Sequence, residues 1–123
     1  MRVTKHEHAG LRIDIGGKLL LIDPGSFTLP LEEVAGAVAV VLTHEHPDHW
    51  TPEHLERILK ASPGIPIFGP EGVAQAAVGY EVTAVAPGDT VAVEPFTLEF
   101  FGGEHILIHE SLPIVQNVGV LVN

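Results

Sequence analysis

The 123-residue sequence contains no cysteine, which excludes both a disulfide framework and a metal site built from thiolates. Its longest largely apolar stretch, residues 34–42, is far shorter than the ~20 residues that a transmembrane helix needs. The first residues, from Met1 to His6, lack the apolar segment of a secretory signal peptide. We therefore expect a soluble, cytoplasmic protein that makes no use of a membrane.

Basic residues are scarce as well. Six Lys and Arg residues stand against sixteen Asp and Glu residues, and the formal net charge is −10. Such a chain repels phosphate backbones unless its basic residues form a local patch, and these six are scattered along the sequence. A nucleic-acid partner is therefore not expected, and the expected substrate is a small molecule.

Short strands and helices follow one another through the chain. The predicted strands are residues 11–15, 19–22, 38–42, 65–68, 82–85, 90–93, 96–101 and 118–122, and the predicted helices are residues 30–35, 52–61 and 70–78. No linker or repeat divides the sequence, so we expect a single domain over residues 1–123. The order of the elements predicts an α/β (α+β) fold, with a mixed β-sheet and helices on one of its faces.

Histidine is unusually frequent, with eight residues in the chain. Residues 44–49 read His-Glu-His-Pro-Asp-His and directly follow the β-branched strand at 38–42. In an extended segment, alternate residues point the same way, so His44 and His46 can converge on one ion while Asp48 and His49 turn toward a neighbouring one. Imidazole nitrogens and a carboxylate oxygen suit Zn²⁺, Fe²⁺ or Mn²⁺. The segment therefore predicts a metal site that binds one or two divalent ions.

The pattern His44-x-His46-x-Asp48-His49 after an apolar strand resembles the HxHxDH motif of the metallo-β-lactamase fold superfamily. Three flanking segments are also similar to that family: residues 21–25 (Leu-Ile-Asp-Pro-Gly), residues 102–105 (Gly-Gly-Glu-His), and residues 108–113 together with 117–119. The last of these resembles a branch of metal-dependent hydrolases that includes lactonase-like enzymes. Together the similarities extend over almost the whole chain.

The resemblance implies a role for each matching residue. His44, His46 and His105 would hold a first metal, with His109 as the alternative to His105. Asp48 and His49 would hold a second metal. Asp48 would also be the catalytic residue that orients or deprotonates the attacking water, and Asp23 would orient a ligand imidazole through its ring N–H.

The resemblance also implies that this sequence corresponds to the N-terminal half of an αββα sandwich. Family members continue into a second half that supplies a bridging Asp and a final His for the second metal, and no residue here matches either. We expect a hydrolase that cleaves an ester, lactone, amide or phosphodiester bond. The alternative is a catalytically incomplete half-domain that binds metal and serves in assembly. With one apolar face of the sheet open, we expect a homo-oligomer or a partner that covers it.

The remaining histidines and Glu45 are not favoured as ligands. His54 falls in the first turn of the helix predicted at 52–61, where a structural or surface role is usual. His6 and His8 have HxH spacing, and they resemble the family's early hairpin near the cleft, but no carboxylate follows them at usable spacing. Glu45 stands between two predicted ligands and should point away from them.

Overall fold

The computed structural model describes residues 1–108 and 110–123 of the chain. In this part of the chain, six strands form one mixed sheet in the order β1-β2-β3-β4-β5-β6. They are β1 (Arg2–Lys5), β2 (Leu11–Ile15), β3 (Lys18–Ile22), β4 (Ala37–Val41), β5 (Ile67–Gly69) and β6 (Val82–Ala84). Neighbouring strands are antiparallel from β1 to β3 and parallel from β3 to β6. Because β3 and β4 are parallel, the loops that follow them leave the sheet at the same edge.

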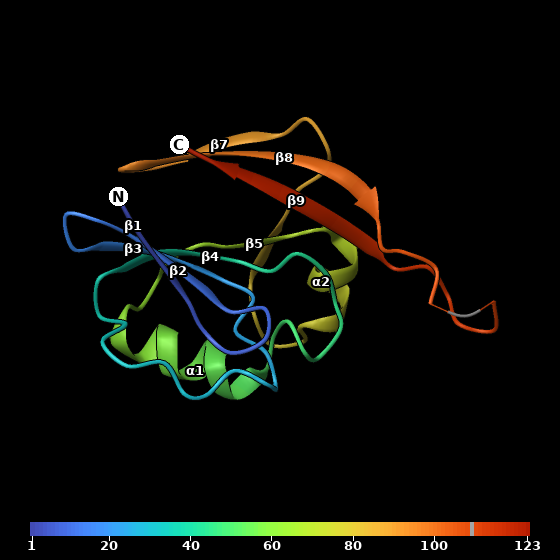
Figure 1. Ribbon diagram of the computed structural model, residues 1–123, viewed down its shortest axis with the longest axis horizontal. Helices are drawn as coiled ribbons and strands as arrows, with labels where there is room; N and C mark the ends of the chain where they lie inside the picture. The colour runs from blue at the N-terminus through green and yellow to red at the C-terminus, as the bar shows by residue number, and fades with distance from the viewer. Residues whose placement is uncertain (109) are drawn as a thin grey trace.

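Two helices of the described residues, α1 (Pro52–Ala61) and α2 (Glu71–Ala76), cover one face of this sheet (Figure 1). Thr51 caps α1, and its side chain accepts a hydrogen bond from a backbone N–H of the first turn. Leu55 and Ile58 lie on one side of α1 and are fully buried against the sheet. Truncation of either side chain to Ala costs about 2–5 kcal/mol of stability in such a core. The prediction of helices on one face is confirmed, and neither helix is long and apolar enough to cross a membrane.

A second sheet covers the opposite face of the first one (Figure 1). Its strands β7 (Thr90–Val93), β8 (Phe96–Glu104) and β9 (Gln116–Val122) are antiparallel, in the order β7-β8-β9. Phe96, Leu98, Phe100 and Val118 point inward from it and pack on Ile13, Leu20, Ile22, Ala39, Val41 and Phe68 of the first sheet. The expectation of an open apolar face is therefore wrong, because the last three strands pair with one another and lie over that face.

Two elements differ from the sequence-based prediction. No helix forms over residues 30–35, although Leu31 and Val34 are both buried in the core. Glu33 has a left-handed backbone (φ 55°), which an α-helix cannot contain. In addition, β1 pairs with β2 at the edge of the sheet, and its residues are almost all exposed, so its hydrophobic pattern is too weak to predict a strand.

Candidate metal centre

Asp23 contacts two residues of the loop that carries the predicted ligands. It follows β3, has a left-handed backbone (φ 51°) and is only 4% exposed. Its Oδ1 accepts a hydrogen bond from Thr43 N (2.8 Å), and its Oδ2 accepts one from Thr43 Oγ1 (2.6 Å). The same Oδ2 lies 2.7 Å from His49 Nδ1. Asp23 therefore contacts a predicted ligand imidazole through a ring nitrogen, the contact that the resemblance implied, and joins the loop after β3 to the loop after β4.

The loop after β3 also packs directly on the predicted metal-binding loop. A Cβ atom added to Gly25 would lie 1.9 Å from the carbonyl oxygen of Asp48, so only glycine permits this approach. Ser26 N donates to the carbonyl of Pro47 (2.9 Å). The His54 imidazole, buried at the start of α1, lies 3.1 Å and 2.9 Å from the carbonyls of Gly25 and Thr28 through Nε2. His54 therefore holds the loop after β3 in place and lies outside the cluster of predicted ligands.

His44, His46 and His105 come together, although His105 lies on the second sheet's side of the molecule. One potential ligand atom from each of the three lies within 4.8 Å of the others. The ring centroids are 4.9 Å apart for His44 and His46, 4.8 Å for His44 and His105, and 4.9 Å for His46 and His105. The second sheet makes this possible: Val118 N donates to the carbonyl of Thr43 (2.9 Å) and so connects β9 to the loop after β4. These are the three residues predicted to hold the first metal.

Hydrogen bonds to two of these imidazoles leave Nε2 as the free ring nitrogen. His44 Nδ1 lies 3.0 Å from Thr43 Oγ1, and His105 Nδ1 lies 2.8 Å from the carbonyl of Ile106. His44 is 3% exposed, and its Nε2 is buried without a hydrogen-bond partner among the described residues. Burial and the charge of neighbouring His49 lower the pKa of His44 to about 4, so the ring is neutral at pH 7. A buried, neutral and unpartnered imidazole nitrogen facing two other imidazoles fits a divalent metal ion.

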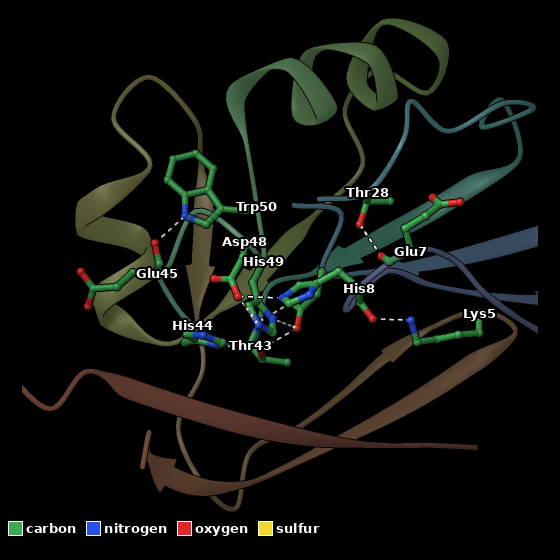
Figure 2. A network of polar contacts seen from close by, with 11 residues as sticks. Lys5, Glu7, His8, Thr28, Thr43, His44, Glu45, Asp48, His49 and Trp50 are labelled. Atoms are coloured by element: carbon green, nitrogen blue, oxygen red, sulfur yellow. Dashed lines mark hydrogen bonds and ion pairs between the residues drawn. The ribbon is translucent and has the colours of Figure 1, made fainter. Parts of the chain in front are cut away.

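Asp48 and His49 form a second cluster beside the first, and His8 joins them (Figure 2). His8 Nε2 lies 2.8 Å from Asp48 Oδ2, and His49 Nε2 lies 3.5 Å from the same oxygen. Burial alone would raise the pKa of the Asp48 carboxyl, but the hydrogen bond from His8 and the charge of His49 outweigh it and lower this pKa. Burial likewise opposes protonation of His49, yet the hydrogen bond to Asp23 and the charges of Asp23 and Asp48 raise its pKa.

Among the other residues considered from the sequence, His8 is the one whose contact with the site was missed. The sequence assigned it no carboxylate, because Asp48 lies forty residues further along the chain. The one available signal was the resemblance of residues 6–8 to a hairpin near the family's cleft. His6 belongs to neither cluster of the described residues, and Glu45 points toward α2 beside Gly72, away from the imidazoles. His109, the alternative to His105, lies outside the described residues.

Comparison with known proteins agrees with the fold. A family model described as "Beta-lactamase superfamily domain" matches residues 2–122. Protein Rv0786c of Mycobacterium tuberculosis is 33% identical over 123 residues, which are 99% of this chain and 57% of that protein. A UPF0173 metal-dependent hydrolase of Cereibacter sphaeroides is 41% identical over 56 residues, which are 40% of this chain and 24% of that protein. The chain thus spans little more than half the length of the mycobacterial relative.

Solved structures share the same architecture. The metallo-beta-lactamase fold protein YhfI of Bacillus subtilis superposes with a TM-score of 0.67 at 20% sequence identity, over 98% of this chain and 52% of that one. At this identity the similarity establishes the fold. Together with the family match over residues 2–122, it shows that the chain belongs to the beta-lactamase superfamily and has the metallo-β-lactamase fold.

Proposed function

We propose that this protein is a metal-dependent hydrolase whose first metal position consists of His44, His46 and His105. The observation that carries the proposal is the buried Nε2 of His44, which has no hydrogen-bond partner among the described residues and faces the other two imidazoles. Three protein ligands with one open position are typical of catalytic zinc sites, whereas structural sites fill all four positions. The relatives named as metal-dependent hydrolases support the same conclusion.

The surrounding residues orient the imidazoles of the first metal position and keep His44 neutral. Thr43 contacts His44 Nδ1 and is itself held by Asp23, so the orientation of the imidazole is set by a buried hydrogen-bonded chain. The carbonyl of Ile106 does the same for His105. Because His44 is neutral at pH 7, its Nε2 lone pair is available to a metal without prior loss of a proton.

Asp48 is the residue that we assign to catalysis. Its lowered pKa keeps it ionised at neutral pH, and it follows His44 and His46 on the loop after β4. An ionised carboxylate in this place can accept a proton from the attacking water or orient it. His49, held by Asp23, lies 3.5 Å from Asp48 and would serve with it as a ligand of a second ion.

The nitrogen and oxygen donors suit Zn²⁺ best, with Fe²⁺ or Mn²⁺ as alternatives. When bound, such an ion would lower the pKa of water far below its bulk value and would polarise the bond that is cleaved. The substrate that we propose is a small molecule with an ester, lactone, amide or phosphodiester bond. Membership of a family that includes named hydrolases does not favour the alternative of an inactive assembly module.

The test is turnover of chromogenic ester, lactone, amide and phosphodiester substrates by the zinc-loaded protein. We expect hydrolysis of at least one class, its loss on chelation, and a fall of about 10²–10⁴-fold in the Asp48→Asn variant. Glu45→Gln is the matched control, because this carboxylate is on the same loop but points toward α2. If the loaded protein turns over none of these substrates, or if Asp48→Asn is as active as Glu45→Gln, the proposed function is wrong.

A further inference from the structure

We propose that His8 completes a second divalent-cation position together with Asp48 and His49. The sequence offered only two candidate ligands for this position, Asp48 and His49. The structure adds a third from the loop between β1 and β2. This inference rests on the proposed function above, because the second position adjoins the first and shares its loop.

The geometry of the three donors supports a shared ion. One potential ligand atom from each residue lies within 4.8 Å of the others. His8 Nε2 and His49 Nε2 approach the same carboxylate oxygen, at 2.8 Å and 3.5 Å. Ligand atoms about 2.0–2.1 Å from a tetrahedral zinc ion are separated by similar distances. Two imidazoles and one carboxylate close together match the three protein ligands of catalytic zinc sites, in which a fourth coordination position is open.

His49 is oriented for this role. Its Nδ1 is engaged by Asp23, which leaves Nε2 directed at Asp48. A carboxylate behind the distal nitrogen of a metal-binding imidazole is the usual arrangement in metalloproteins. The rings of His44 and His49 have centroids 3.9 Å apart, so the second position would adjoin the first.

The loop that carries His8 is fastened to the rest of the site. Thr28 Oγ1 donates to the carbonyl of Glu7 (2.9 Å), and Leu29 N donates to Glu7 Oε1 (3.1 Å). Lys5, the last residue of β1, donates from Nζ to the carbonyls of His6 and His8 (Figure 2 shows the contact with His8). These contacts connect His8 to the loop after β3, which also packs on the carbonyl of Asp48 through Gly25. The His8 side chain is therefore exposed, but hydrogen bonds hold the backbone of its loop in place. Its ring points toward Asp48.

The experiment counts ions on metal-free protein. Co²⁺ is titrated against a chromophoric chelator, and the bound metal is also measured by elemental analysis after dialysis. We expect two ions per chain in the wild type and one in His8→Asn. Asparagine tolerates the left-handed backbone of His8 (φ 57°) but lacks the imidazole. His6→Asn is the matched control on the same loop, and it should keep both ions.

The size of the effect separates a ligand from a mere hydrogen-bonding neighbour. Loss of a partner behind a ligand typically weakens metal binding by about 10–100-fold, so we expect more than ~100-fold for the second ion in His8→Asn. In parallel, the ¹⁵N NMR signal of the His8 ring should shift with the second equivalent of Zn²⁺ and stay in place with the first. Circular dichroism shows whether each variant is folded, and the NMR measurement on the wild type needs no variant.

The outcomes separate the two proposals. If His8→Asn still binds two ions with wild-type affinity, or if the His8 ring does not respond to Zn²⁺, the second position is wrong and the proposed function is unaffected. If His46→Ala keeps the tighter ion while His8→Asn loses one, the first position, and with it the proposed function, is wrong.

Discussion

The two clusters of candidate ligands differ in what their polar atoms contact. In the first, His44 is buried and its Nε2 contacts no donor or acceptor of the described residues. In the second, the groups contact one another: His8 pairs with Asp48, and His49 with Asp23. Burial lowers the pKa of His44, whereas carboxylates raise the pKa of His49 above its ordinary value. Two neighbouring imidazoles on the same loop thus have pKa values shifted in opposite directions.

This difference indicates which position needs a metal. A buried polar atom without a partner costs free energy, and an ion at the first position would remove that cost. At the second position the metal must replace hydrogen bonds and ion pairs that the metal-free protein already makes. We therefore expect the first ion to bind more tightly and the second more weakly.

The largest effect should follow from removing a ligand of the first position. His46→Ala should abolish tight metal binding, because two imidazoles remain where three are needed. His54→Ala should keep it, since His54 contacts the carbonyls of Gly25 and Thr28 and no member of the cluster. Competition with a chelator measures both affinities. Equal affinity in the two variants would contradict the ligand assignment.

The same titration decides the third ligand. We expect His105→Ala to weaken binding as His46→Ala does, because His105 lies with His44 and His46. His109→Ala should bind as the wild type does. The reverse result would transfer the third ligand from His105 to His109.

The next effect is on stability against pH in metal-free protein. The pKa of His44 is about 4 in the folded state and 6.5 ordinarily, so between these values the unfolded state binds more protons. Stability therefore falls as the pH drops through this range, by about 3 kcal/mol for a shift of this size. His49 has the opposite sign: its raised pKa contributes stability that is complete below pH 6.5 and is lost as the pH rises through the folded value.

Urea unfolding in the presence of a chelator, at a series of pH values from about 4.5 to about 9, measures these slopes. His44→Gln should remove most of the acid-side loss, and His49→Gln should remove the alkaline-side loss. The comparison within each variant cancels the cost of the substitution itself. Equal pH slopes in wild type and His44→Gln would show that burial does not govern this imidazole.

The first cluster was predictable from sequence to a large extent, and in the second cluster Asp48 and His49 were predicted but His8 was not. His44 and His46 are two residues apart at the end of a buried strand, so local geometry alone brings them to one side. His105 was added by resemblance, and the structure brings it to the other two through the contacts of β9 with Thr43 and His44 in the loop after β4. His8 contacts Asp48 across forty residues, and no local pattern indicates such a contact.

The fold shows the same limit. The strands at 90–93, 96–101 and 118–122 were all predicted, yet their pairing was not, because an alternating pattern shows that one face is buried without showing against what. They form a sheet of their own that buries Phe96, Leu98 and Phe100 on the first sheet. The predicted helix at 30–35 failed for a related reason: buried residues three apart suggest a helical turn, but so short a segment has little helical stability of its own.

A smaller effect should come from Asp23, which contacts His49 of the second cluster directly and His44 of the first through Thr43. Asp23→Asn keeps the size of the side chain, and Asn tolerates the left-handed backbone, but it replaces the charged acceptor for Thr43 and His49. We expect a loss of about 1.5–3 kcal/mol of stability, because the lost hydrogen bonds involve a buried charge. The affinity for the second ion should also fall by about 10–100-fold.

Asp14→Asn is the control for this substitution. Asp14 Oδ1 accepts a hydrogen bond from Gly17 N in the exposed turn between β2 and β3. This contact involves no member of either cluster. It should leave metal affinity unchanged. If Asp23→Asn binds the second ion as tightly as Asp14→Asn does, the carboxylate behind His49 does not tune the site.

The smallest expected effect concerns self-association of the chain. It depends on which residues surround each metal position. The first position adjoins a segment that extends away from both sheets (Figure 1) and exposes at least half of Ile106, Leu107, Ile108, Leu112 and Ile114. The second adjoins the polar loop of His8. Exposed apolar side chains of this kind favour burial against a second copy, although the charge of −10 per chain opposes it. We expect a homodimer at micromolar concentration, strengthened by salt, which screens charge beyond ~8–10 Å and leaves apolar burial intact.

Light scattering coupled to size exclusion measures this association. The double substitution Leu107→Ser/Ile108→Ser should weaken the dimer by about 10-fold, because each side chain contributes part of its apolar burial. Val78→Ser is the matched control, since Val78 is 86% exposed after α2, on the helical side of the molecule. Neither substitution removes a ligand, so both variants should keep the metal content of the wild type. A monomer at all salt concentrations would show that this segment is not an interface between copies, and loss of metal in the double variant alone would show instead that it supports His105.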